Sequence, residues 1–102
     1  AELLKMVTIN GAAALGKADK IGSVEVGKKA DVILLDISQP HLAATHNLLN
    51  TVVESIDGHD VTDSIIDGKL VMRNRKVLTL DEEKIIADSR QRIKELAIRA
   101  GF

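Results

Sequence analysis

The feature that most constrains the fold is a segment of short apolar runs separated by two turn signals. Asp67-Gly68 separates Ser64-Ile65-Ile66 from Lys69-Leu70-Val71-Met72. This pair favours a type I′ hairpin turn, in which both central residues need a positive φ. A second turn at Arg73-Asn74-Arg75-Lys76 leads into Val77-Leu78-Thr79-Leu80. The pattern predicts a three-stranded meander.

The residues before the meander predict one further strand and a loop. Residues 30–36 contain an apolar, β-branched run bounded by polar residues, which predicts a buried strand. Residues 39–50 lack a clear period and predict a loop. Residues 51–55 fit either a short strand or a helical turn.

Both ends of the chain have helical periodicity. The first segment ends at Gly16, and we expect Asn10-Gly11 to divide it into two short helices with Asn10 as the N-cap of the second. The last segment begins with acidic residues 81–83, which suit a helix N-terminus, and ends at Gly101. Its apolar stripe consists of Ile85, Ile86, Ile93, Leu96 and Ala97.

Composition excludes several classes of function. Phe102 is the only aromatic residue, which argues against stacking on single-stranded nucleic acid. The net charge of −1 gives no electrostatic footprint for nucleic acid or anionic lipid, and no apolar run approaches the ~20 residues that span a bilayer. The chain has no cysteine, which excludes disulfides and thiolate chemistry and is compatible with a cytoplasmic location. We therefore expect a cytoplasmic protein that binds neither nucleic acid nor membrane.

Gly22, Gly27 and Lys28 match most of a phosphate-binding loop, G-x-x-x-x-G-K. Such a loop needs a strand before it, a helix after it, and Ser or Thr following the lysine. Here residue 29 is lysine and a strand is predicted to follow. We interpret Gly27-Lys28 as a turn between two strands, without a nucleotide site.

No residue of the chain forms a recognisable active site. His41, His46 and His59 lie in predicted loops, and their spacing matches no known metal signature. Surface or hydrogen-bonded histidines are the main interpretation, and a three-histidine metal site is the alternative. The aspartates lie mostly at strand ends and turns, where they have ordinary structural uses. We therefore assign no catalytic, cofactor-binding or metal-ligating residue to this chain.

Two longer stretches resemble the amidohydrolase superfamily. Residues 7–16 are similar to its A-T-x-N-G-A-x-x-L-G motif, and residues 21–36 are similar to I-G-x-L-x-x-G-K-x-A-D-L-V-x-x-D. The resemblance to the second motif implies that the stretch around Gly27 is a tight turn between two strands of the family's sandwich.

Later motifs resemble one branch of that superfamily, which holds adenosine-type and guanine deaminases and triazine chlorohydrolases. Gln39-Pro40-His41 and His46-Asn47 are similar to its Q-P-H…H-N loop. Residues 60–71 resemble D-V-x-x-V-x-V-N-G-K-x-V, and residues 79–85 resemble T-x-D-E-E-x-I. The resemblance covers nearly the whole chain.

The resemblance implies where the chain belongs in the family fold, a (β/α)8 barrel beside a small β-sandwich. The expected class is an α+β fragment from the C-terminal end, with β-sandwich strands flanked by helices. Residues 1–16 would be the terminal barrel helix region, 17–80 the returning β-sandwich strands and loop, and 81–102 the C-terminal helix. The chain also opens inside an apolar helical pattern, so we expect a part of a longer protein.

The resemblance also implies the chemistry of the parent enzyme. That enzyme would be a metal-dependent hydrolase with zinc or iron, deaminating a purine-like ring or cleaving a related C–N or C–Cl bond. The family's metal ligands include a His-x-His pair, which this chain lacks, so no ligand role is carried over to His41, His46 or His59. The chain alone is expected to have no activity. Its expected partners are the rest of the barrel and, in a homo-oligomer, a second copy.

A stand-alone β-sandwich interaction module without catalytic activity is the alternative. The fragment hypothesis and the module hypothesis predict different surfaces. A piece of a larger enzyme should expose apolar helix faces that pack on the barrel, for example at Leu3, Leu4 and Val7. A true module should fold cooperatively as a monomer or a defined oligomer.

Overall fold

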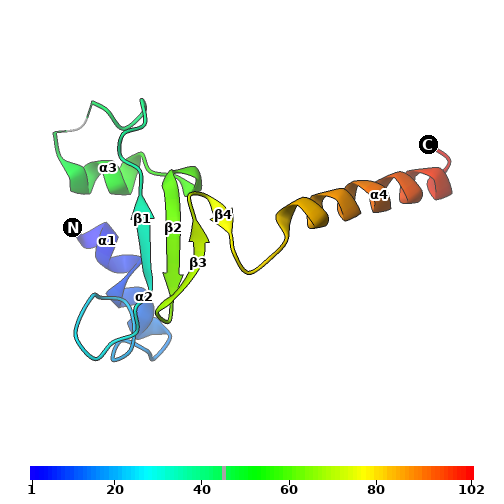
Figure 1. Cartoon of the computed structure of the whole chain (residues 1–102). Helices are drawn as coiled ribbons and strands as arrows, with labels where there is room; N and C mark the ends of the chain where they lie inside the picture. Colours follow the sequence, from blue (N-terminus) through cyan, green and yellow to red (C-terminus); the bar gives the residue numbers. More distant parts are fainter. Residues whose placement is uncertain (45) are drawn as a thin grey trace.

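The computed structural model describes residues 1–44 and 46–102. Their elements are α1 (Glu2–Met6), α2 (Ile9–Ala14), β1 (Val32–Leu35), α3 (Leu48–Glu54), the 3-10 helix η1 (Gly58–Asp60), β2 (Val61–Ile66), β3 (Lys69–Arg73), β4 (Lys76–Val77) and α4 (Glu82–Ala100). The sheet stands at the centre, with α1, α2 and α3 beside β1 (Figure 1). The helix α4 projects away from the opposite edge, beyond β4 (Figure 1). The fold class is therefore α+β.

The four strands form one antiparallel sheet in the order β1-β2-β3-β4. Asp67 and Gly68 have φ values of 52° and 75°, as the type I′ turn between β2 and β3 requires. Asn74 and Arg75 also have positive φ, 48° and 63°, in the turn between β3 and β4. The predicted meander is confirmed, although its last strand is shorter than expected and ends at Val77.

The turn at Gly27 is confirmed, but the strand expected before it is wrong. The structure has no strand in residues 21–31, so Gly27, with φ 90°, leads from a loop into β1. The loop is held by its own side chains: Lys28 Nζ donates to Ser23 Oγ (2.6 Å) and lies 3.2 Å from Glu25 Oε1. These local bonds close the loop on itself, and Val24 beside them stays exposed.

The break between the first two helices also differs from the prediction. It falls at Val7-Thr8, and Asn10 and Gly11 lie inside α2. Thr8 Oγ1 donates to Leu4 O (2.7 Å), which turns the chain at the end of α1. A Cβ on Gly11 would lie only 3.3 Å from Met6 O, so this glycine serves a close approach of the two helices.

The segment 51–55 proves to be helical. The side chain of Asn47 accepts hydrogen bonds from Leu49 N (3.1 Å) and Asn50 N (3.3 Å), which caps α3 at its N-terminus. This cap lets the helix begin inside the predicted loop. The two possibilities left open by the sequence are therefore resolved in favour of the helix.

Little of the apolar surface is buried. Ala12 and Leu42 are the fully buried apolar side chains within the described ranges. The strand predicted to be buried, β1, has Ile33 and Leu34 54% and 52% exposed. The prediction of a buried strand is wrong for this chain, because the described elements form a single sheet and leave the apolar side chains of β1 without full cover.

The C-terminal helix agrees with the sequence pattern. Asp81 accepts a hydrogen bond from Lys84 N (3.0 Å) as its N-cap, and Gly101 ends it with φ 82°. None of the helices in the described part of the chain combines the length and apolar character needed to cross a membrane.

Gly22→Ala should destabilise the chain more than Gly27→Ala. The two glycines have nearly equal φ, 92° and 90°, so each alanine costs about 1–2 kcal/mol of backbone strain. A Cβ at Gly22 would also lie 2.8 Å from Ala12 Cβ and 2.9 Å from Ile9 Cα, whereas one at Gly27 meets nothing within 4 Å. We expect the overlap to add about 1–3 kcal/mol. Urea unfolding followed by circular dichroism measures both, and equal losses would contradict the close approach.

Candidate functional site

A polar cluster gathers where β1 ends and η1 begins. Asp60 is its centre: it is 2% exposed, and its Oδ2 accepts hydrogen bonds from Asp57 N (3.0 Å) and His41 Nε2 (3.0 Å). The sequence favours this geometry locally, because Asp57 accepts from His59 N (2.7 Å) and forms a reciprocal capping box with Asp60. The cluster thus fixes the loop around His41 against η1.

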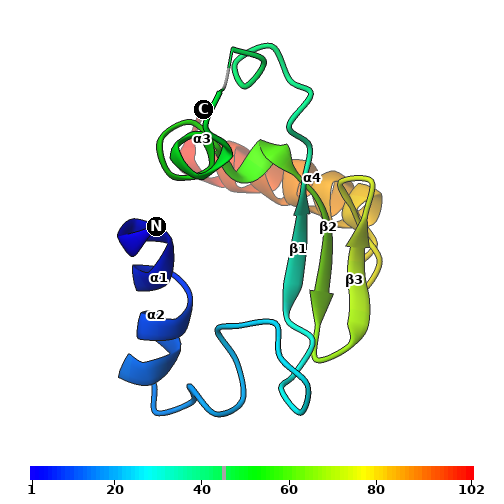
Figure 2. The same cartoon turned by 90° about the vertical axis from the view of Figure 1, so that its left-hand side faces the viewer.

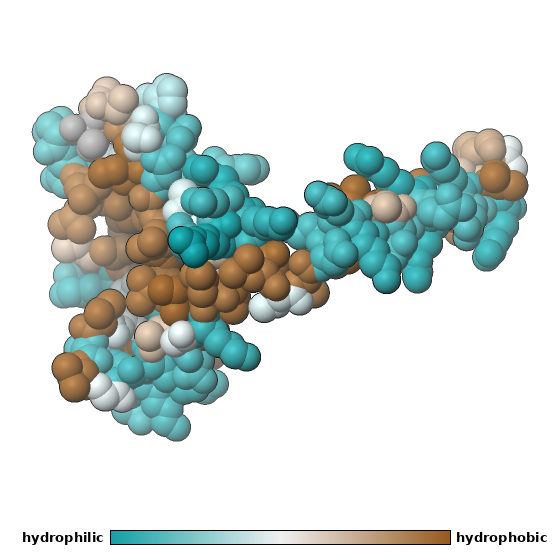
Figure 3. All heavy atoms as spheres, viewed as in Figure 1, coloured by the Kyte–Doolittle hydropathy of each residue, from teal (hydrophilic) through white to brown (hydrophobic). Residues whose placement is uncertain are grey.

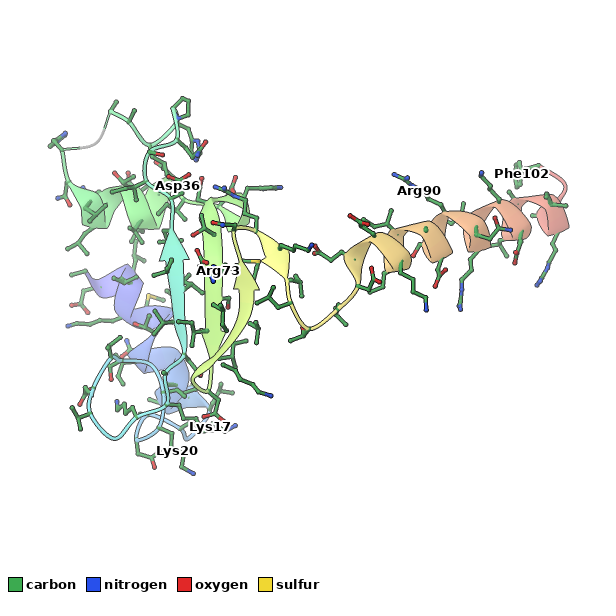
Figure 4. The ribbon with its side chains drawn as sticks, in the orientation of Figure 1. Lys17, Lys20, Asp36, Arg73, Arg90 and Phe102 are labelled. Carbon is green, nitrogen blue, oxygen red and sulfur yellow. The ribbon has the colours of Figure 1, made fainter. Side chains whose placement is uncertain are left out.

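Asp36 extends the same cluster at the end of β1 (Figure 4). Its carboxylate accepts hydrogen bonds from Ser38 N (3.0 Å), Ser38 Oγ (2.6 Å) and Gln39 Nε2 (2.6 Å), and from the Arg75 guanidinium at 3.4 Å. Arg75 Nε also donates to His59 O (2.8 Å). The cluster therefore connects β1, η1 and the turn after β3.

The hydrogen bonds keep both carboxylates ionised. The backbone amide of Asp57 and then His41 hold the pKa of Asp60 below its ordinary value. The hydroxyl and amide of Ser38, followed by Gln39, hold the pKa of Asp36 well below its usual range. A general base works best with a pKa near the operating pH, so these carboxylates are suited to holding loops together.

The histidines do not converge on a metal. His41 bonds Asp60, His59 is fully exposed with its Nδ1 3.4 Å from Asp57 Oδ1, and His46 lies with His41 along a hollow of about 220 Å³ beside α3. Within residues 1–44 and 46–102, no three His, Asp or Glu side chains are grouped so that they could hold a metal ion. The residues described here therefore do not fit the metal centre of the resembled family.

The second feature is an apolar groove between α1, β1 and α3. Its volume is about 940 Å³. The side chains that line it include Leu3, Leu4, Met6, Val7, Ile33, Leu35, Val52, Val53, Ile56 and Val61. Apolar surface gathers on this side of the molecule in Figure 3. Figure 2 shows α1 standing apart from β1, with α3 near one end of the gap.

The groove was predicted only in part. Exposure of the first helix is confirmed at Leu3 and Val7, and Leu4 is half-buried in the groove. Sequence reasoning missed the contribution of β1 and α3. The signal for α3 was the spacing of Val52, Val53 and Ile56, which places three apolar side chains on one side of a helical turn. The groove sets exposed apolar side chains side by side, so it can bind another apolar surface.

Acid should weaken the chain through the polar cluster. The folded-state pKa of Asp60 is lowered, so its stabilisation is present above the ordinary value of about 3.9 and is lost as the pH falls through the lowered pKa. Asp60→Asn removes this titration, and the free energy of unfolding should then fall less steeply between about pH 5 and about pH 2. Urea unfolding across this range measures the slope. An unchanged slope in Asp60→Asn would contradict the assignment.

Comparison with known proteins gives a consistent result. The sequence pattern of the Amidohydrolase family matches residues 1–71. The chain is 46% identical over 98 residues to a 5-methylthioadenosine/S-adenosylhomocysteine deaminase of Thermoanaerobacter pseudethanolicus, covering 96% of this chain and 23% of that protein. It is 44% identical over 100 residues to a 5'-deoxyadenosine deaminase of Methanosarcina acetivorans, covering 98% of this chain and 23% of that protein.

Solved structures agree with these relatives. An adenosine deaminase from Xanthomonas campestris with bound zinc matches with a TM-score of 0.82 and 35% identity, over 93% of this chain and 22% of that one. The zinc complex of atrazine chlorohydrolase from Arthrobacter aurescens TC1 has the same fold over 88% of this chain and 20% of its own, with a TM-score of 0.76 and 23% identity.

The chain thus spans less than a quarter of the curated relatives that it matches. The family pattern covers more than half of the chain, and the relatives align along almost all of it. The chain therefore belongs to the amidohydrolase family.

Proposed function

We propose that this chain is the C-terminal part of a metal-dependent amidohydrolase that deaminates an adenosine-like nucleoside. Its own role is structural: it completes the small β-sandwich of the enzyme and covers the barrel wall. The observation that carries this proposal is the apolar groove, in a chain that aligns with about a fifth of the length of adenosine-type deaminases.

The groove is suited to a protein surface. Fully burying one leucine or valine side chain stabilises by about 1.5–3 kcal/mol, and the groove presents several that are half exposed or more. Small-molecule sites are concave and place a few polar groups to orient the ligand. Here aliphatic side chains and Met6 make up most of the lining, and Thr8, Asp57 and Gly58 make up the rest. We expect apolar strands or helices of the remaining enzyme to pack on this surface.

Catalysis belongs to the rest of the enzyme in this proposal. Deamination of an adenine ring adds water and releases ammonia, which requires groups that accept and deliver protons. The carboxylates of Asp36 and Asp60 are held ionised by their hydrogen bonds, and the described residues do not fit a metal centre. In this proposal, the residues that bind the metal and transfer protons belong to the remainder of the enzyme.

The substrate class is inferred from the relatives. Those with 42–46% identity include deaminases of 5-methylthioadenosine, S-adenosylhomocysteine and 5'-deoxyadenosine. The triazine-hydrolysing structures share only 23% identity and support the fold alone. An adenosine-like nucleoside is therefore the better supported substrate.

A chimeric enzyme tests the proposal. The chain replaces its matched segment in the Thermoanaerobacter pseudethanolicus deaminase, to which it is 46% identical. We expect the chimera to release ammonia from 5-methylthioadenosine, whereas the chain alone releases none. A soluble chimera that carries metal but has no activity on any of the three adenosine-like substrates would overturn the structural role that we propose for this chain.

Val7→Asp and Val26→Asp form a matched pair for the groove. Val7 lines the groove and is 78% exposed, while Val26 lies fully exposed in the loop before Gly27. Neither change should unfold the chain itself, because neither side chain is packed. In the chimera, we expect Val7→Asp to reduce soluble, active enzyme by at least about tenfold, the effect of about 1.4 kcal/mol, and Val26→Asp to leave it near the parent level.

Assays of ammonia release and of soluble yield decide between the two variants. Equal activity of both variants would show that the groove does not dock on the rest of the enzyme. A chain that is monomeric by itself, unfolds in one cooperative transition and is indifferent to Val7→Asp would support the stand-alone module instead.

A further inference from the structure

The helix α4 has an apolar stripe that no described element covers. None of its residues is buried, and it projects clear of the sheet (Figure 1). Ile85, Ile86, Ile93 and Leu96 lie along one side of the helix and are each 47% to 66% exposed. A stripe of this kind on a helix of 19 residues is typical of a helix that packs its apolar side against other protein.

The charges of α4 are divided along its length. Residues 81–88 hold four acids and one lysine, a net charge of −3, and residues 89–100 hold four basic residues and one acid, a net charge of +3. The helix dipole explains acids in the first turn and Arg99 in the last. It does not explain Asp88, Arg90 and Arg92, because its effect fades within one turn of each end. Arg90 extends from the middle of the helix into solvent (Figure 4).

We propose that α4 packs antiparallel against α4 of a second copy of this chain. The antiparallel arrangement places the acidic half of each helix beside the basic half of the other, whereas a parallel pair would place like charges together. The surface is then self-complementary, as a two-fold interface requires. The helices would be in contact along about 28 Å, from 1.5 Å per residue.

Two pairs of stripe residues have the matching symmetry, whereas the counterpart of Ile93 is Ser89. Ile86 and Leu96 lie equally far from position 91, and so do Ile85 and Ala97. A two-fold axis near position 91 therefore sets Ile86 against Leu96 of the second copy. It also brings Asp88 close to Arg92 of the other helix, on the same flank of the pair. This pairing does not depend on the deaminase assignment.

The rest of the same enzyme is the competing partner for the stripe. Packing on its own barrel would cover the apolar side chains, but it gives no reason for opposite net charges in the two halves. The second copy accounts for both the stripe and the charges, which is why we favour it.

Disulfide trapping tests the arrangement directly, since the chain has no cysteine of its own. Ile86→Cys and Leu96→Cys are introduced into two full-length chains that carry different affinity tags, and the chains are mixed under mild oxidation. Disulfides need Cβ atoms about 3.5–4.5 Å apart. Antiparallel pairing should give the 86–96 product several-fold over the 86–86 and 96–96 products, as read by intact mass spectrometry.

Ile98→Cys is the matched control, because Ile98 is 74% exposed but lies on the other side of α4 from the stripe. It should give only background disulfides with either partner. A predominance of 86–86 and 96–96 products would show parallel pairing and overturn the proposal. Equal amounts of all products, or none above the control, would show that α4 does not pair specifically with itself.

A charge exchange gives a second, independent readout. Asp88→Lys in the Ile86→Cys chain should reduce the 86–96 product, and Arg92→Glu in the Leu96→Cys chain should restore it. Helix content by circular dichroism should stay unchanged throughout. No loss with Asp88→Lys would overturn the proposed charge pairing.

The same variants in the chimeric enzyme separate the two proposals. An active chimera without the 86–96 product would retain the proposed function and reject the pairing of α4. An inactive chimera that still forms the 86–96 product would do the reverse.

Discussion

The buried carboxylate of Asp60 is the interaction on which the arrangement of the loops depends. The carboxylate accepts hydrogen bonds from the backbone amide of Asp57 and the ring of His41. The backbone carbonyl of Asp60 also accepts a hydrogen bond from Asp36 N (2.8 Å). These bonds fix the end of β1, the loop after it and η1 to one another. Because α3 lies between this loop and η1, the same cluster places one wall of the apolar groove.

Local chemistry decided which elements could be predicted. The Asp67-Gly68 turn and the cap at Asp81 depend on residues within a few positions, so their sequence signals were sufficient. The expected break at Asn10-Gly11 was wrong, because Gly11 serves the approach of Met6 and not a helix end. A glycine signals conformational freedom or lack of space, and only the packed structure distinguishes the two.

In the candidate site too, local features were predictable from the sequence and features that depend on tertiary packing were not. An exposed apolar face on α1 was predictable from helical spacing. The groove was not, because it also requires β1 and α3, which tertiary packing brings together with α1. The strand β1 has the composition of a fully buried strand but is about half exposed. Such a composition suits a strand that is covered on both faces, and the described residues do not provide this cover.

The order of the strands gives the sheet two unequal edges. At one edge, β4 has only two residues, begins with Lys76 and follows a tight turn, so it offers a short and charged border. At the other edge, β1 presents four consecutive aliphatic residues and no proline or lysine within the strand. The sequence of β4 therefore discourages pairing with a further strand, whereas the sequence of β1 has none of these features. The two edges of the sheet thus differ in how strongly they oppose contact with another chain.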